Sequence, residues 1–114
     1  FPVDPAALLQ YAAVAERLGH FGAARSALTD YAALVPSDAE ATGYAARVGT
    51  LSLAANDPAG ALPWLERAAA QTPDDVPVLA NLADAQLRLG RVEAARQTVA
   101  RARGVAPTDR RLRT

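Results

Sequence analysis

Residues 76–109 read VPVLANLADAQLRLGRVEAARQTVARARGVAPTD, and this stretch decides the fold. In its first half the apolar residues lie three, four or seven positions apart, the spacing of one helix face; they are Leu79, Leu82, Ala83 and Leu89. Gly90 breaks this pattern, and a second apolar row follows in Val92, Ala95, Val99 and Ala102, with Arg96 beside it. Two short helices joined at a glycine form a hairpin, which cannot bury its apolar faces alone.

The rest of the chain repeats this hairpin twice, at steps of 37 and then 34 residues. Three series show the repeat most clearly: the turn residues Gly19, Asn56 and Gly90, the second-helix alanines Ala24, Ala61 and Ala95, and the closing prolines Pro36, Pro73 and Pro107. Five further columns follow the same steps: Leu8, Ala45 and Leu79; Tyr11, Val48 and Leu82; Ala12, Gly49 and Ala83; Leu28, Leu65 and Val99; Tyr31, Ala68 and Ala102. Only Tyr31 departs from its own column.

This period, with helix–turn–helix units, resembles the tetratricopeptide repeat family over residues 5–109. The resemblance is strongest in the small residues, which let two helices approach closely where their axes cross. It implies an all-α fold in which three hairpins (residues 5–38, 42–75 and 76–109) stack as a right-handed superhelix, with 110–114 beginning a truncated capping helix. The chain departs from the family at Ala15, Ser52 and Gln86, where a large aromatic residue is usual.

Composition bounds the remaining possibilities. The 114 residues favour one domain, and they are 51% hydrophobic but only 5% aromatic. All 12 basic residues are arginine, which we interpret as the codon bias of a GC-rich bacterial genome. The absence of cysteine leaves both the bacterial cytoplasm and the periplasm open, and no apolar run approaches the ~18 residues of a membrane span. The chain begins at Phe1 without a signal-peptide pattern, so we expect a piece of a longer protein or a processed product.

Charge is unevenly distributed along the chain. Residues 1–87 hold 4 arginines and 10 acids (net −6), whereas residues 88–114 hold 8 arginines and 2 acids (net +6). A solvated outer face explains this pattern best, and an acidic or nucleic-acid partner near the C-terminus is the alternative. The nucleic-acid alternative lacks interleaved aromatic residues, and it requires binding that weakens steeply with added salt.

Several helix starts can be read from local sequence. Asp4 and Asp57 each precede a proline and are expected to cap a helix. Residues 37–40 have the spacing of a capping box, which places a helix start at about Asp38. The three extra residues of the longer repeat then add a turn to this helix or lengthen the preceding loop. Trp64 is expected to pack on a neighbouring repeat, with an exposed aromatic contact as the alternative.

The last hairpin is expected to lack a cover. In the resembled family a closing helix usually covers the last apolar face. Here that face is predicted to carry Val99, Ala102 and Val105, and its exposure predicts self-association through the third repeat or a missing downstream segment.

The resemblance also implies that the first helices of the hairpins line a concave surface. Helical phase places eleven candidate partner-binding residues there: Leu9, Ala13, Glu16, Arg17, Arg47, Thr50, Leu53, Asn81, Asp84, Leu87 and Arg88. Some family members clamp a partner's C-terminal carboxylate on this surface. The corresponding positions here lack most of the required donors, so we reject that clamp and expect a protein or peptide partner in an extended or helical form.

No set of residues indicates catalysis. The chain has no cysteine, a single histidine (His20), no glycine-rich phosphate loop and no spacing of metal ligands. The sequence therefore predicts an interaction module without a catalytic, cofactor or metal site. The alternatives are a self-associating structural repeat or an arginine-rich nucleic-acid-binding segment.

Overall fold

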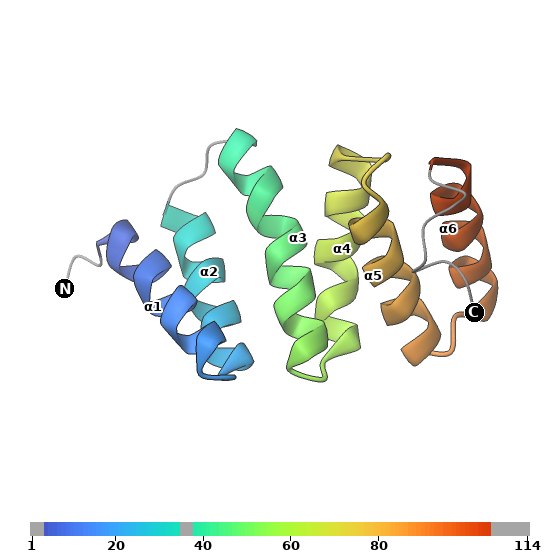
Figure 1. Cartoon of the computed structure of the whole chain (residues 1–114). Helices are drawn as coiled ribbons and strands as arrows, with labels where there is room; N and C mark the ends of the chain where they lie inside the picture. The colour runs from blue at the N-terminus through green and yellow to red at the C-terminus, as the bar shows by residue number, and fades with distance from the viewer. Residues whose placement is uncertain (1–3, 35–37, 106–114) are drawn as a thin grey trace.

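Six α-helices follow one another in this computed structural model, which describes residues 4–34 and 38–105 (Figure 1). They are α1 (Pro5–Arg17), α2 (Phe21–Leu34), α3 (Asp38–Ala54), α4 (Pro58–Gln71), α5 (Val76–Arg88) and α6 (Val92–Val105). No strand occurs within these described ranges. The closing segment expected at 106–114, with Pro107, lies outside them.

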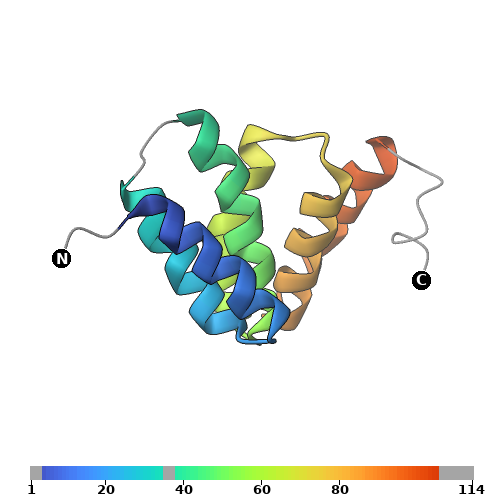
Figure 2. The same cartoon turned by 60° about the vertical axis from the view of Figure 1, so that its left-hand side comes forward.

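The helices stack side by side in chain order as three antiparallel hairpins (Figures 1 and 2). Each helix packs on the next one along the chain, and α3 also touches α5, so the first helices of the second and third hairpins meet. The result is an elongated stack of 47 × 26 × 22 Å. This confirms the predicted all-α fold of stacked hairpins.

The predicted caps form at the described helix starts. The carboxylate of Asp4 accepts a hydrogen bond from the Ala6 N–H at 3.0 Å, and that of Asp57 accepts one from the Gly60 N–H at 3.0 Å. Such bonds satisfy backbone donors that have no partner within the helix. Asp75 caps α5 in the same way, through the Val78 N–H at 3.2 Å.

The three turns share one geometry. Gly19, Asn56 and Gly90 all have a positive φ, of 79°, 60° and 78°. The following residue in each turn donates a backbone hydrogen bond of 2.8 Å to the carbonyl five residues earlier. This is the motif that ends a helix at a left-handed residue, where glycine is favoured and asparagine is tolerated. The column of turn residues therefore reflects a shared backbone requirement.

The extra residues of the longer repeat lengthen a helix, which decides between the two alternatives left open by the sequence. α3 has 17 residues, against 13 in α1 and in α5, and it begins at Asp38 as predicted. Figure 1 shows its first turn standing beyond the end of α2. Ser37, the predicted cap, lies outside the described residues.

Buried side chains form two clusters that meet at α3 and Trp64. One cluster joins α1, α2 and α3, and the other joins α3, α4, α5 and α6. Trp64 is half-buried and packs against both. It therefore contacts a neighbouring repeat, as expected, and links the first hairpin to the other two.

A small buried residue recurs at one position of the first helix in each hairpin. Ala12, Gly49 and Ala83 are all buried. The tightest contact is at Gly49, where an added Cβ would lie 2.6 Å from both Cγ and Cδ2 of Leu65. Because Leu65 is itself completely buried, it has little room to move aside.

Two large apolar residues of the first helix are exposed. Tyr11 and Leu18 expose 57% and 65% of their surface, although Tyr11 shares a column with the buried Val48 and Leu82. Tyr11 differs from the rest of its column because Val48 and Leu82 are covered by the preceding hairpin. α2 packs on α3 and α4 packs on α5, whereas no described helix precedes α1.

The last helix lies at the end of the described stack, and one prediction for its exposed face was wrong. Val92 is 49% exposed, because no described helix packs on the outer side of α6. Conversely Ala102, predicted to be exposed, is completely buried in the cluster shared with α4 and α5. The exposed end face of α6 carries Val105 and part of Val99 instead.

The contact at Gly49 gives a matched pair of substitutions within one helix. Alanine in place of glycine gains about 0.5–1 kcal/mol from helix propensity, whereas overpacking a full core costs about 1–3 kcal/mol. We expect Gly49→Ala to lower the free energy of unfolding, measured by urea titration. Gly43→Ala, where an added Cβ meets nothing within 4 Å, should raise it. Equal effects of the two substitutions would contradict the packing described here.

Candidate functional site

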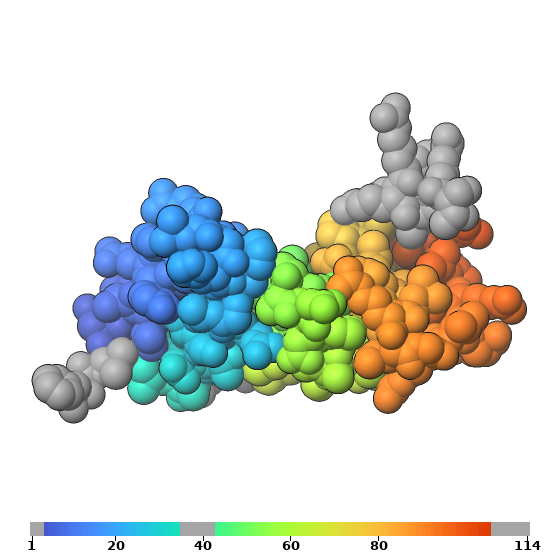
Figure 3. Space-filling view, turned by 90° about the horizontal axis from the view of Figure 1, so that it is seen from below, coloured from blue at the N-terminus to red at the C-terminus, as the bar shows by residue number. Residues whose placement is uncertain are grey.

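The first helices α1, α3 and α5 carry the residues predicted to bind a partner. In Figure 3 the outline is hollowed over the middle hairpin, whose green residues lie lower than the blue residues of the first hairpin. Ten of the eleven predicted residues are exposed or half-buried at this face. Leu53 is the exception, because it is 8% exposed and belongs to the core cluster of the second and third hairpins. Its side chain is therefore withdrawn from the candidate surface.

Polar side chains connect successive first helices across this face. The guanidinium of Arg47 on α3 donates to the carboxylate of Glu16 on α1 at 3.3 Å. The amide of Asn81 on α5 donates to the Thr50 hydroxyl on α3, also at 3.3 Å. Each pair is separated by 31 residues and joins neighbouring repeats. The structure thus brings four of the predicted residues into two contacts.

Arg88 closes the row at the third hairpin. It donates to the carboxylate of Asp84 at 3.1 Å and to the backbone carbonyl of Leu53 at 3.4 Å. Leu53 therefore contributes to this face through its backbone. We name the row formed by Glu16, Arg47, Thr50, Asn81, Asp84 and Arg88 the polar row. Four predicted residues, Leu9, Ala13, Arg17 and Leu87, make no polar side-chain contact within the described chain.

A hollow of about 300 Å³ opens beside the polar row, at the junction of the first and second hairpins. It is lined by Glu16 and Phe21 from the first hairpin and by Arg47, Thr50, Leu51 and Ala54 from the second. The ion pair of Arg47 and Glu16 therefore lies at one edge of this hollow, and Phe21, Leu51 and Ala54 form its apolar walls. This arrangement can receive a side chain and offer it either charge.

A family model described as tetratricopeptide repeat matches residues 52–114, which is 63 of the 114 residues. The chain belongs to the tetratricopeptide repeat family. Among solved structures, that of MamA from AMB-1 is similar to this tetratricopeptide repeat chain, with a TM-score of 0.82 and 21% identity. The match covers 96% of this chain and 58% of that one, and at this identity it shows the fold alone. No curated protein matches the sequence.

Two kinds of feature, a metal site and a membrane-spanning helix, were sought among the described residues of the tetratricopeptide repeat chain. No group of three or more His, Cys, Asp or Glu side chains in these residues could hold a metal ion. Likewise, none of their helices is long and apolar enough to cross a membrane.

A second polar cluster, which the sequence did not reveal, joins the first two repeats at their turn end. Arg25 on α2 donates to the carboxylate of Asp57, the cap of α4, at 2.7 Å, and to the Ser52 hydroxyl at 3.5 Å. Ser52 is completely buried and itself donates to the Val48 carbonyl at 2.9 Å. Arg25 and Asp57 are 32 residues apart. The repeat pattern does not predict this pair, because the equivalent positions in the following repeat hold Leu62 and Arg91.

The electrostatics of this cluster favour a charged aspartate. The Gly60 N–H and then the Arg25 guanidinium hold the pKa of Asp57 below its ordinary value of 3.8. A carboxyl group whose folded pKa is lowered stabilises the fold at pH values above its unfolded pKa. That stabilisation disappears as pH falls through the folded pKa.

We therefore expect part of the acid sensitivity of this repeat domain to depend on Asp57. Asp57→Asn keeps a capping side chain but removes the charge, so it should lower the melting temperature near neutral pH. The difference from wild type should shrink as pH falls below about 4, measured by circular dichroism melts. Asp74→Asn, in an exposed loop, is the control and should follow the wild-type curve. A constant difference between Asp57→Asn and wild type across this pH range would contradict the argument.

Proposed function

We propose that this tetratricopeptide repeat domain binds an extended or helical segment of a partner protein along the polar row. The observation that carries the proposal is a row of half-exposed side chains of both charges, which crosses two repeat junctions beside the hollow at Arg47. Exposed polar groups at regular intervals can pair with successive groups of a peptide. The exposed Leu87 adds an apolar contact at one end of the row.

The ion pair within the polar row is weak enough for a partner to replace it. The ion pair between Arg47 and Glu16 has both side chains 42% exposed, and such exposed pairs contribute about 0–1 kcal/mol. A partner that supplies a carboxylate to Arg47 or a cation to Glu16 can therefore replace it at small cost. The surrounding helices remain fixed by the buried clusters.

The proposal assigns a binding role and no catalytic one to this chain. The single histidine, His20, lies exposed in the first turn, and the acids of the polar row are paired with arginines. General acid–base chemistry needs an acid and a base that converge on one substrate, whereas each acid of the polar row faces an arginine. We further propose that the domain serves as part of a larger protein or assembly.

Peptides selected from a random phage-displayed library against the wild-type domain test this proposal. We expect Arg47→Ala combined with Asn81→Ala to weaken the selected peptides by about tenfold or more, measured by fluorescence anisotropy. Arg67→Ala removes an exposed arginine from α4, away from the polar row, and should leave affinity unchanged. Peptides that bind the double variant as well as wild type would refute a site on the polar row.

Self-association is a second candidate, favoured by the two end faces. Tyr11, Val14 and Leu18 are exposed on α1. Their repeat equivalents Val48, Leu51, Leu82 and Ala85 are buried between hairpins, and Ala55 and Leu89 are partly buried. At the other end, an apolar hollow of about 400 Å³ is lined by Leu87, Val92 and Val99 with Arg96 and Arg103. The α1 face of one copy could therefore continue the stack on the α6 face of another.

Light scattering across protein concentration tests this second candidate. We expect the mass to rise with concentration, and either Leu18→Glu or Val92→Glu to abolish the rise, because a head-to-tail contact uses two different faces. Leu34→Glu changes another exposed leucine, on α2, and should have no effect. A monomer at every concentration would remove this candidate and leave the peptide-binding proposal untouched.

A further inference from the structure

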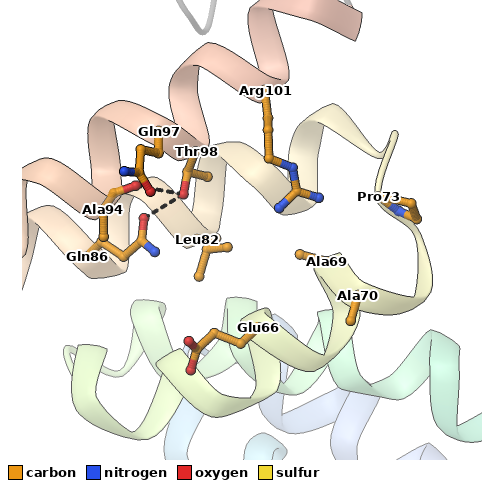
Figure 4. A pocket seen from close by; sticks show the side chains of 10 residues that line it. All are labelled: Glu66, Ala69, Ala70, Pro73, Leu82, Gln86, Ala94, Gln97, Thr98 and Arg101. Carbon is orange, nitrogen blue, oxygen red and sulfur yellow. Dashed lines mark hydrogen bonds between the residues drawn. The ribbon is translucent and has the colours of Figure 1, made fainter.

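The helix α6 borders two hollows that differ in charge. The hollow on its inner side, between α4 and α6, has Glu66 on one wall and Arg101 on the other (Figure 4). The hollow on its outer side is lined by apolar residues such as Val92 together with Arg96 and Arg103, and none of its described lining residues is acidic. The outer side, which we call the α6 face, therefore combines apolar surface with charge of one sign.

The first junction between hairpins shows what an arginine at the position of Arg96 does when another hairpin follows. Its repeat equivalent Arg25, on α2, donates to the carboxylate of Asp57 at 2.7 Å and to the hydroxyl of Ser52 at 3.5 Å. Both acceptors belong to the next hairpin, and Asp57 caps its second helix, α4. An arginine at this position therefore binds an acid at the turn of the hairpin that follows.

The second junction has neither the arginine nor the acid. Leu62 takes the position of Arg25 and is buried in the core, and the next hairpin has Arg91 at the position of Asp57. The residue before each junction thus matches the turn after it, because arginine occurs where an acid follows and leucine where a cation follows. An arginine covered by a hairpin without an acid would lose water and gain no partner.

The arginines of the α6 face have no such acid within the described chain. Arg96 pairs with Glu93 of its own helix at 3.7 Å, and these side chains are 74% and 76% exposed. Pairs this exposed are weak, so another carboxylate can replace Glu93. Arg103 adds a second cation where its repeat equivalent Ala69 is buried in the core. A hairpin that covers this face must therefore accommodate two positive charges.

A second copy of this chain would not supply the acid. Where its first hairpin continued the stack, His20 and Ala15 would take the positions of Asp57 and Ser52. Neither side chain carries a negative charge, and alanine has no side-chain acceptor. Contact between copies would leave Arg96 without the pair that Arg25 forms, and is therefore weaker than contact with an acidic partner.

We propose that the α6 face binds a helical hairpin of another protein, one that carries an aspartate or glutamate at the start of its second helix. Arg96 donates to this carboxylate as Arg25 donates to Asp57, and Val92 and Val99 pack against the helices of the partner. This role goes beyond the proposed binding along the polar row. It also names a different occupant for the face considered above for self-association.

Two blocked variants of the chain, which can meet through one pair of faces, test this proposal. Val92→Glu blocks the α6 face, so this first chain can bind only through its α1 face. Leu18→Glu blocks the α1 face, so this second chain offers only its α6 face. Adding His20→Asp to the first chain then places an acid at the position equivalent to Asp57. Fluorescence anisotropy of the labelled first chain measures the affinity between the two.

We expect His20→Asp to tighten this binding about tenfold or more, because it supplies the carboxylate for Arg96. His20→Asn, a matched change without charge, should give a much smaller gain. Arg96→Ala in the second chain should abolish the gain from His20→Asp. This comparison separates pairing from the better cap that an aspartate gives to α2, since the cap is unaffected by Arg96.

Three results would overturn the proposal. Equal affinity of the first chain with and without His20→Asp would assign the face to a second copy instead. A gain that survives Arg96→Ala would show that the arginine does not bind the acid, and no binding by either chain would show that an acidic hairpin does not fit the face. Arg47→Ala combined with Asn81→Ala should leave this affinity unchanged, so the outcome is independent of the proposed site on the polar row.

Discussion

The close approach of the two helices within each hairpin is the constraint on which the rest of the structure depends. Helices can meet at short distance only where one side chain is small, and here that position holds Ala12, Gly49 and Ala83. At Gly49 there is no room even for a methyl group beside Leu65. The hairpin formed at this contact has apolar faces on both sides, which stacking then buries.

The two junctions between hairpins use different chemistry, although the repeat positions correspond. Arg25 pairs with Asp57 at the first junction, whereas its repeat equivalent Leu62 is buried in the core at the second. Ion pairs between half-exposed side chains contribute less than buried apolar surface. The hollow beside Arg47 opens at this more polar junction. The first hairpin is therefore the part expected to separate from the others at the lowest free energy, and it borders the proposed partner site.

Sequence alone predicted what depends on the local chain and on the repeat period. Helix starts, the turn column and the small-residue column were correct, because each is fixed by hydrogen bonds or contacts within one hairpin. Errors arose where burial depends on a neighbour. Tyr11 shares a column with core residues, but no described hairpin precedes it, and Leu53 is covered by the adjacent repeat. The pair of Arg25 and Asp57 could not be predicted, since it joins one turn to a distant helix and has no counterpart in the other repeats.

The central claim, that steric contact between Gly49 and Leu65 sets the approach of the helices, is tested most directly by a double-mutant cycle. The free energy of unfolding would be measured for Gly49→Ala in the wild-type and Leu65→Ala backgrounds, with sucrose present to keep the destabilised variants folded. We predict that Gly49→Ala destabilises the wild type but is neutral or stabilising when Leu65 has been truncated, because the clash is then gone and helix propensity remains. The same loss in both backgrounds would show that Leu65 is not what excludes a larger residue, and would contradict the account.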